Sequence, residues 1–421
     1  MIKVFNFKKS NYKKKLALFL KKRSLGDNKE QKLVRSILND IKKNGSKAVL
    51  KYEKKYSKNN QLKPSVKKIN SSIKLLDRKT RDAIDFAYKR IYKFHSAQKI
   101  KNISYKDSLG NQLEYKYFPI ESIGVYVPAN LPSSVLMNTI PAKIAGVKKI
   151  VLVNPKTKGR LDPAVLYAAK KIGVSEILSL GGAQAIGSLA YVQKVNKIIG
   201  PGNIFVANAK KELFGQVGLE GMIAGPSEIT ILADNNSNVE EVVTSMIAQA
   251  EHDVRSQSIL ITKSKKLAME VNKKIFSFLK NLPKKDVALK SLKINGLIIL
   301  IKNDKQISEV INEIAPEHLE MNIKNYKKYL NKIKNVGSIC LGKYSPMAVT
   351  DYNAGTNHVL PTQGSAKFSS GLNLNEFYKK ISYINLSKKG VEVIGKKAIT
   401  LAEYEQLIGH AQSIKSRIRR K

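Results

Sequence analysis

The feature that most constrains the fold is an alternation of short β-branched runs with helical stretches, which begins at about residue 120. Strands are predicted at 123–128, 149–155, 176–180, 228–234, 258–262, 296–301 and 337–341, and helices at 163–171 and 239–251. Such alternation is typical of parallel βαβ units. We therefore expect an α/β fold of two Rossmann-like domains with parallel sheets, arranged in tandem or with one inserted in the other.

The residues before and after this alternation differ from it in composition and in predicted secondary structure. Residues 1 to about 105 read as helical and rich in lysine, with an apolar stripe over 34–41 and a plausible stop at Gly45. A second helix is predicted over about 71–98, where we interpret His95 as a packing histidine. The last 40 or so residues are mixed, charged and partly helical, as in a small tail domain.

The charge balance alone favours a nucleic acid or an anionic membrane as partner, because 76 Lys+Arg face 32 Asp+Glu and give a net charge of +44. The lysines are spread along the chain, however, and no RNA-binding motif or zinc finger is readable. No stretch approaches the roughly 20 apolar residues of a membrane span. We therefore expect neither a specific nucleic-acid partner nor a membrane.

Two further features of the sequence favour a cytoplasmic protein. The start of the chain lacks the apolar run and the cleavage site of a secretory signal. Cys340 is the only cysteine, so neither a disulfide within the chain nor a thiolate metal site is available. A reducing compartment is the natural interpretation.

The chain has only five histidines, and four of them follow one another in its second half: His252, His318, His358 and His410. Imidazole titrates nearest neutral pH and is the commonest metal ligand in proteins. Two of these histidines directly follow a glutamate, and His358 follows Asp351 by seven residues. Any one of them alone is more often structural, but all four together indicate a metal site or a proton-transfer site.

Three local arrangements carry these residues. Gln249 and His252 lie three apart near the end of a predicted helix, which suits two ligands of one ion or an exposed polar helix end. Glu317 and His318 follow a proline, and they form either a pair of proton carriers or a solvated helix start. The polar loop 351–362 contains Gly and Asn residues that would fold its two ends toward one point.

The glycine-rich loops are weaker signals. Gly181 and Gly182 stand at a strand–helix junction and could admit a phosphate, although they do not form the dinucleotide fingerprint. Residues 200–203, Gly-Pro-Gly-Asn, place a polar group at the same edge of the sheet. Residues 225–228 read as a plain turn. Since no serine–histidine pairing is readable, Ser227 is not expected to be a nucleophile.

Together these motifs resemble the histidinol dehydrogenase family over nearly the whole chain. Seven motifs occur in order: Gly-Val-Tyr-Val-Pro, Gly-Gly-Ala-Gln-Ala-Ile, Gly-Pro-Gly-Asn, Ala-Gly-Pro-Ser-Glu, Gln-Ala-Glu-His, Ala-Pro-Glu-His-Leu and Asp-Tyr-x-x-Gly-Thr-Asn-His-Val-Leu-Pro-Thr. Glu405 and His410 follow at the family's spacing. The resemblance implies oxidation of L-histidinol through L-histidinaldehyde to L-histidine, with reduction of two NAD⁺.

The resemblance also assigns roles to individual residues. The zinc ligands, for one ion per subunit, would be Gln249, His252, Asp351 and His410. Glu317 and His318 would be the acid/base pair. Histidinol would contact Ser227, His358 and Glu405 in addition to the metal ligands and the acid/base pair. NAD⁺ would contact Tyr126, Gln184 and Asn203.

Family members are homodimers in which the C-terminal segment crosses to the partner, so Glu405 and His410 would complete the other subunit's site. The expected domain ranges are 1–105 for the helical N-terminal region, 106–125 with 230–378 for a first α/β domain with the metal and catalytic residues, 126–229 for a second α/β domain on the NAD side, and 379–421 for the tail.

Two departures from the family pattern lie near the expected cofactor side. Ala129-Asn130 stands where Gly-Gly is usual, and Leu219-Glu220 stands where an Ile-Asp pair is common. One alternative is a related zinc- and NAD-dependent dehydrogenase that acts on another small polar alcohol, but His358 and Glu405 favour histidinol. A polyanion-binding protein with an inactive enzyme fold is a further alternative, and retention of every catalytic position argues against it.

Overall fold

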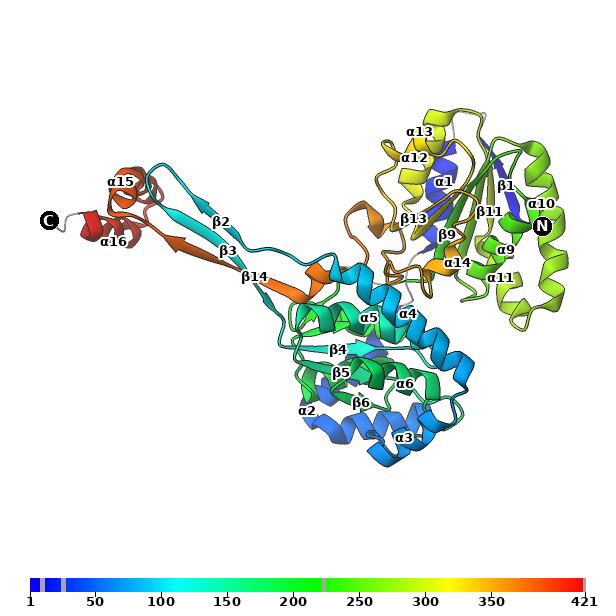
Figure 1. Ribbon diagram of the computed structural model, residues 1–421, viewed down its shortest axis with the longest axis horizontal. Coiled ribbons are helices and arrows are strands. Elements are labelled where there is room, and N and C mark those ends of the chain that lie inside the picture. The colour runs from blue at the N-terminus through cyan, green and yellow to red at the C-terminus, as the bar shows by residue number, and fades with distance from the viewer. Residues whose placement is uncertain (8–11, 24–27, 222–224, 419–421) are drawn as a thin grey trace. The chain divides into compact units, whose positions relative to one another are not determined.

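The computed structural model describes residues 1–7, 12–23, 28–221 and 225–418 (Figure 1). Two compact units divide the chain: unit 1 is Met1–Gln98 with Glu121–Glu376, and unit 2 is Lys99–Ile120 with Phe377–Lys421. Segment 99–120 joins the C-terminal residues because its long strand pairs with a strand of the tail. The expected boundaries between the two α/β domains stay a prediction.

Sheet A of unit 1 has six parallel strands in the order β1-β11-β10-β9-β12-β13. Their bounds are β1 (Lys3–Asn6), β9 (Glu228–Ala233), β10 (Gln257–Thr262), β11 (Leu297–Leu300), β12 (His318–Asn322) and β13 (Ser338–Leu341). Every residue of β9, β10 and β12 is buried, as expected for a parallel sheet with helices on both faces. The predicted strands of this half are confirmed.

Two layers of helices cover sheet A. One apolar cluster joins the sheet to α9 (Val239–Ala250), α10 (Lys265–Phe278) and α11 (Lys285–Asn295). The cluster on the other face involves α1 (Tyr12–Leu20), α12 (Asp304–Ile314) and α13 (Lys327–Leu330). The short α14 (Met347–Thr350) follows β13.

Sheet C of unit 1 is also parallel, with the strand order β6-β5-β4-β7-β8. Its strands are β4 (Ser122–Tyr126), β5 (Lys149–Val153), β6 (Glu176–Leu178), β7 (Lys197–Ile199) and β8 (Gly218–Leu219). Its helices are α5 (Pro132–Ala145), α6 (Pro163–Ile172), α7 (Gly182–Gly187) and α8 (Ile204–Glu212). In sequence this sheet is inserted between β1 and β9, which confirms the fold class and selects insertion over a tandem arrangement.

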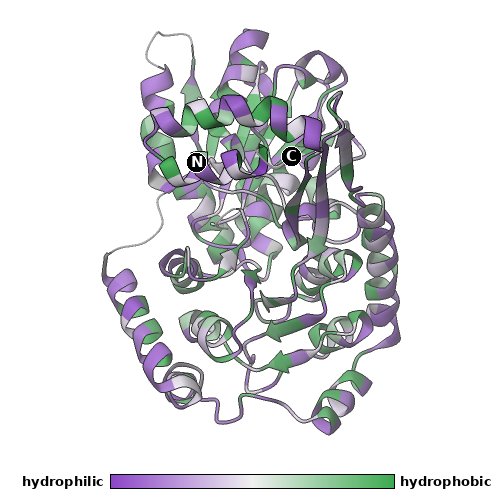
Figure 2. Cartoon of the chain, turned by 90° about the vertical axis from the view of Figure 1, so that its left-hand side faces the viewer, coloured by the Kyte–Doolittle hydropathy of each residue, from purple (hydrophilic) through white to green (hydrophobic). Residues whose placement is uncertain are grey.

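Local signals explain where several of these helices begin and end. The Asp162 side chain accepts the N–H groups of Ala164 and Val165 and so caps α6. Gly146 and Gly173 end α5 and α6 in the left-handed conformation that glycine adopts at low cost. In Figure 2 the helical ribbons alternate between purple and green, the pattern of helices with one apolar face.

The helices of residues 28–96 pack on the sheet-C half. The predicted helix stop at Gly45 is confirmed, because within the span α2 (Asn28–Ser57) this glycine has a non-helical backbone with φ 56°, and a second helical stretch follows it. Two other expectations about the N-terminal region are corrected. The single helix expected over 71–98 is two helices, α3 (Val66–Lys74) and α4 (Arg78–Ser96), because Asp77 caps a new start. The region expected to be helical also contains β1, which pairs with β11.

Unit 2 is built on a three-stranded antiparallel sheet with the order β14-β3-β2. β2 is Ile103–Lys106, β3 is Gln112–Pro119 and β14 is Tyr378–Asn385. Two helices follow, α15 (Lys388–Tyr404) and α16 (Ile408–Ile418), and they pack on each other. Among the described residues of the whole chain, no helix combines the length and the apolar character that crossing a membrane requires.

Candidate functional site

Most of the predicted site residues line one cavity of about 380 Å³ in unit 1. Those on its walls are Asn203, Ser227, Gln249, His252, Glu317, His318, Asp351 and His358. The structure therefore brings together residues that are up to 155 positions apart in the sequence, because the loops of both sheets converge here.

The two sheets present opposite strand ends to this cavity. On the sheet-A side, Ser227 directly precedes β9 and His318 is the first residue of β12, so the amino ends of strands face the site. On the sheet-C side, Pro128 and Pro201 follow β4 and β7, so carboxyl ends face it. The wall on the sheet-A side therefore carries the end of α9, and the wall on the sheet-C side carries the starts of α5 and α8.

Gln249 and His252 lie at the end of α9, as predicted. Gln249 is in the last turn and is 1% exposed. Its Oε1 atom accepts no hydrogen bond from the described residues, although it is buried. His252 is exposed on the cavity wall, and partial desolvation, with a contribution from Lys284, lowers its pKa, which favours the neutral imidazole. A buried oxygen without a donor beside a neutral imidazole suits a cation.

Asp351 follows α14 and contributes a carboxylate to the same cavity. Burial raises the pKa of Asp351 to about 7, because desolvation disfavours the charged carboxylate. A nearby cation would stabilise its ionised form. The amide oxygen, the imidazole and the carboxylate therefore fit a metal ion by their chemistry.

The described part of unit 1 does not supply a full ligand set of the usual types. Among the described residues, no group of three or more His, Cys, Asp or Glu side chains is placed to hold a metal ion. Gln249 is outside those four types, and only His252 and Asp351 of the predicted ligands on this cavity belong to them. A fourth donor would have to come from elsewhere.

Glu317 and His318 are buried side by side at the start of β12. The Glu317 carboxylate accepts the Glu228 N–H at 2.8 Å, and burial raises its pKa well above the usual range, reinforced by the charges of Glu228 and Asp351. His318 Nε2 lies 3.9 Å from Glu317 Oε1 and 3.8 Å from Asp351 Oδ1. Burial lowers the pKa of His318 to about 3, and its Nδ1 has no partner among the described residues.

The polar loop that begins at Asp351 folds back on itself, which confirms the expectation from its Gly and Asn residues. His358 Nδ1 lies 2.7 Å from the carbonyl oxygen of Asp351. Burial also lowers the pKa of His358, to about 4. Asn357 fixes the loop, since its side chain donates to the Met137 carbonyl at 2.7 Å and accepts the Val359 N–H at 2.9 Å.

A buried ion pair beneath the site was not predicted from the sequence. Arg23 Nε lies 3.3 Å from Glu228 Oε1, with side chains 9% and 3% exposed. Arg23 also donates to the Ile314 carbonyl at 2.7 Å, and its own carbonyl accepts from the Gln363 side chain at 2.6 Å. The pair thus connects the loops before β9, before β12 and after His358. Arg23 lies in lysine-rich sequence that offers no signal for it.

On the sheet-C side only one of the three predicted NAD contacts lines the cavity. The Asn203 side chain caps α8 by accepting the N–H groups of Phe205 and Val206. Tyr126 and Gln184 belong to the same edge of sheet C but are buried, 4% and 3% exposed, and do not line the cavity. Their role as NAD contacts stays a prediction.

The start of α7, where a phosphate was one possibility, already holds a carboxylate of the chain itself. Glu53 Oε1 accepts the Gly181 N–H at 2.8 Å and the Gln184 side-chain amide at 2.9 Å. Glu53 is 1% exposed. These two donors therefore serve the packing of α2 against α7, and the phosphate interpretation stays a prediction.

Both departures from the family pattern have a structural account. Asn130 has a φ of 55°, a left-handed conformation that asparagine tolerates better than other non-glycine residues. Glu220 is buried and forms an ion pair with Lys210, which also donates to the Gly200 carbonyl. The acidic character at this position thus supports the Gly-Pro-Gly-Asn loop.

Glu405 and His410 belong to unit 2. Glu405 directly follows α15, His410 lies in α16, and both side chains are exposed. The prediction that they complete the site of a partner subunit is untested by the structure of one chain.

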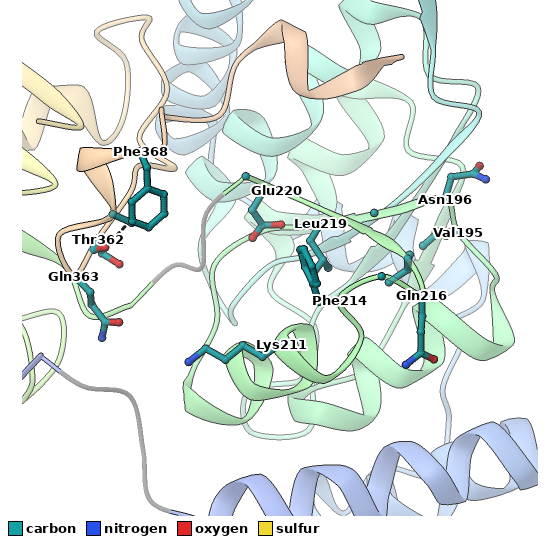
Figure 3. A pocket seen from close by; sticks show the side chains of 15 residues that line it. Val195, Asn196, Lys211, Phe214, Gln216, Leu219, Glu220, Thr362, Gln363 and Phe368 are labelled. Carbon is teal, nitrogen blue, oxygen red and sulfur yellow. Dashed lines mark hydrogen bonds between the residues drawn. The ribbon is translucent and has the colours of Figure 1, made fainter. Parts of the chain in front are cut away.

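A second cavity of unit 1, of about 1110 Å³, contains none of the predicted site residues. Figure 3 shows Phe214, Lys211 and Gln216 on one side of it and Thr362, Gln363 and Phe368 on the other. The rings of Phe214 and Phe368 are 82% and 83% exposed. Thr362 lines both cavities, so the two are adjacent.

Comparisons with known proteins agree with this geometry. The sequence profile of the histidinol dehydrogenase family matches residues 20–418. A histidinol dehydrogenase of Pelagibacter ubique (strain HTCC1062) is 57% identical over 428 residues, covering 100% of both chains. One from Acinetobacter baylyi is 40% identical, covering 99% of this chain and 100% of that protein. The crystal structure of histidinol dehydrogenase from Elizabethkingia anophelis is similar with a TM-score of 0.93 at 34% identity, covering 99% of this chain and 98% of that chain.

Proposed function

The chain belongs to the histidinol dehydrogenase family, and from this premise we propose that it is a zinc-dependent oxidoreductase that converts L-histidinol to L-histidine through L-histidinaldehyde, with reduction of two NAD⁺. The observation that carries the proposal is the cavity that gathers three metal-ligand types, one of them the unpartnered Gln249 amide oxygen, beside two buried proton carriers. The reaction requires both functions at one place.

Gln249, His252 and Asp351 would hold the zinc ion, one per subunit, with His410 of a second subunit as fourth ligand. When bound, zinc supplies a Lewis acid that orients the imidazole and amino nitrogens of the substrate. Ser227, His358 and Glu405 would hold histidinol beside it. The hydrogen bond between His358 Nδ1 and the Asp351 carbonyl leaves Nε2 of His358 for this contact.

His318 would take the proton of the alcohol as the first hydride leaves. Burial lowers its pKa to about 3, so the imidazole is unprotonated at rest but a weak base, and its Nδ1 atom has no partner among the described residues. The neighbouring carboxylates, at 3.8 and 3.9 Å from Nε2, would stabilise the imidazolium that forms.

Glu317 would take a proton from the water molecule that adds to the aldehyde before the second hydride leaves. The raised pKa of Glu317 supports this role, because a carboxylate of higher pKa is a stronger base once it is ionised. The Glu228 N–H, which donates to Oε2 at 2.8 Å, fixes the carboxylate while it acts.

NAD⁺ would bind on the sheet-C side, with Tyr126, Gln184 and Asn203 as contacts. Two helix starts, those of α5 and α8, lie on the cavity wall here. Helix starts carry partial positive charge, which favours the pyrophosphate. At α8 the N–H groups of Phe205 and Val206 are already capped by the Asn203 side chain. Oxidation of the alcohol and then of the hydrated aldehyde would each consume one NAD⁺.

The active form would be a homodimer with shared sites, in the cytoplasm. Two features of unit 2 support the exchange of its C-terminal segment between subunits. His410 is exposed there, and the apolar side chains of Leu401, Tyr404 and Ile408 are 63%, 87% and 54% exposed. Exposed apolar groups beside a metal-ligand type favour a partner surface. Cys340, buried and free, accords with a reducing compartment.

The test is an assay of histidinol-dependent NAD⁺ reduction, with and without a metal chelator. We expect two NADH for each histidinol consumed, loss of the activity on chelation and recovery on addition of zinc. A folded, zinc-loaded preparation that forms no NADH from histidinol would contradict the proposal. Other small amino alcohols in the same assay separate histidinol from a broader substrate class.

A further inference from the structure

Glu320 is a buried carboxylate that the proposed chemistry does not use. It lies on β12, two residues after His318, and is 3% exposed. Alternate residues of a strand lie on the same face, so Glu320 and His318 share one face of β12. No described Lys or Arg lies within ion-pair distance of Glu320, and burial raises its pKa.

One hydrogen-bonding partner of Glu320 comes from the helix that ends at the predicted zinc ligands. The Ser245 hydroxyl lies 3.1 Å from both carboxylate oxygens and donates to them. Ser245 is on α9, four residues before Gln249, which is about one helical turn. The contact therefore fixes the last turn of α9 against β12.

The other partner comes from the segment that leads to Asp351. The backbone N–H of Met347 donates to Glu320 Oε2 at 3.1 Å. Met347 is the first residue of α14 and is 1% exposed, and Asp351 follows four residues later, just past the end of this single turn. The position of Asp351 thus depends on how α14 is held.

We infer that Glu320 is a positioning residue for the metal ligands, because its one carboxylate ties α9, which carries Gln249, and α14, which precedes Asp351, to the strand that carries His318. The inference rests on the proposed zinc site. An isolated buried carboxylate costs stability that an apolar side chain of similar size would not. Its two hydrogen bonds reach the only two elements of this cavity that carry predicted ligands.

The experiment measures zinc affinity directly, by competition with a chromogenic chelator, in the full-length protein. We expect Glu320→Met, which removes both acceptors at similar volume, to lower the affinity by about tenfold. Glu320→Gln keeps one acceptor and should be intermediate. Ser245→Ala removes only the α9 contact and should lower the affinity by about fivefold, the effect of one hydrogen bond.

The matched control is Glu53→Gln in the sheet-C half. Glu53 is also a buried carboxylate that accepts one backbone N–H and one side-chain donor, from Gly181 and Gln184. This variant should lower the melting temperature as Glu320→Gln does but leave zinc affinity unchanged. Because Glu320 does not touch substrate, saturating zinc should restore the kcat of Glu320→Gln.

Two outcomes distinguish a failure of the positioning role from a failure of the proposed function. If Glu320→Gln and Ser245→Ala bind zinc as tightly as the unsubstituted protein, or if Glu53→Gln loses zinc equally, the positioning role is wrong and the proposed function stands. If the unsubstituted protein binds no zinc and still oxidises histidinol, the metal part of the proposed function fails first. If Glu320→Met is too unstable to purify, the two milder variants still decide the question.

Discussion

The two parallel sheets of unit 1 line the same cavity with opposite ends. Sheet A contributes the starts of β9 and β12 and the end of α9, whereas sheet C contributes the ends of β4 and β7 and the starts of α5 and α8. Helix C-termini carry partial negative charge and favour cations, and N-termini favour anions. The comparison teaches that the two sheets give one cavity walls of opposite helix polarity, which suits the cation and the dinucleotide of the proposed function.

The largest predicted effect is on kcat and concerns a residue on the sheet-A side. Glu317→Gln removes the proposed base and keeps its shape, so kcat should fall by about 10² to 10⁴-fold. Zinc affinity and the KM for NAD⁺ should stay unchanged, as measured by chelator competition and by steady-state kinetics. A large rise in the KM for NAD⁺ would contradict the proposal that NAD⁺ binds on the sheet-C side and the acid/base pair lies on the sheet-A side.

The next effect concerns the ion pair that holds the sheet-A loops. Arg23→Met leaves Glu228 buried without its partner, so the free energy of unfolding should fall by about 3–5 kcal/mol. Urea denaturation measures this change. The double variant Arg23→Met/Glu228→Met should recover most of the loss, because no charge is then left unpaired. If the double variant is no more stable than Arg23→Met, loss of the ion pair is not the cause of the destabilisation.

A smaller effect is expected on the sheet-C side at Gly200, whose φ is +106° and whose added Cβ would lie 2.1 Å from the Tyr126 carbonyl oxygen. Gly200→Ala should therefore introduce strain of about 1–3 kcal/mol, raise the KM for NAD⁺ and leave zinc affinity unchanged. In the control Gly221→Ala, the added Cβ meets only Glu376 Oε1, at 3.4 Å. Equal effects of the two substitutions would contradict this account of the loop.

The smallest effect is a pH dependence in the helices that cover sheet C. Hydrogen bonds from Lys51, Asn44 and Tyr52 lower the pKa of Asp40 from 3.8 to about 2. A lowered folded-state pKa stabilises the protein above the unfolded value, and the gain is lost as the pH falls through the folded value. Asp40→Asn should therefore be less stable at neutral pH, and the difference should shrink as the pH falls from 3.8 to about 2. A difference that stays constant over this range would exclude the carboxylate as its source.

Much of the fold was predictable because both sheets are parallel and buried on both faces. Such strands are short apolar runs, and the runs at 149–155 and 228–234 became β5 and β9 with small changes at their ends. The helix break at Gly45 was predictable, but the second helical stretch directly after it was not, because a glycine that ends a helix and one that separates two helices look alike in sequence. The α2 span packs against α7 and α8, a contact that local sequence does not reveal.

The site was predictable where a motif carries several polar residues together, as in the loop from Asp351 to His358. Residues whose role is to position other side chains do not form a recognisable motif in the sequence. Arg23 is one cation among 76 Lys+Arg in this chain, and Glu320 looks like an ordinary charged residue after the Glu317-His318 pair. Their importance follows only from burial and partners, which tertiary packing creates.

The insertion of sheet C between β1 and β9 has a consequence for how the chain is made. Among the strands that the structure describes, β1 (Lys3–Asn6) pairs only with β11 (Leu297–Leu300), almost 300 residues later. At about 5–20 residues per second, the first strand waits on the order of 15 to 60 seconds on the ribosome before its neighbour emerges. Sheet C spans residues 122–219 and can pair all its strands during that interval. The nascent protein can therefore pair the strands of sheet C, the proposed dinucleotide side, before sheet A closes around a strand that was synthesised before all the others.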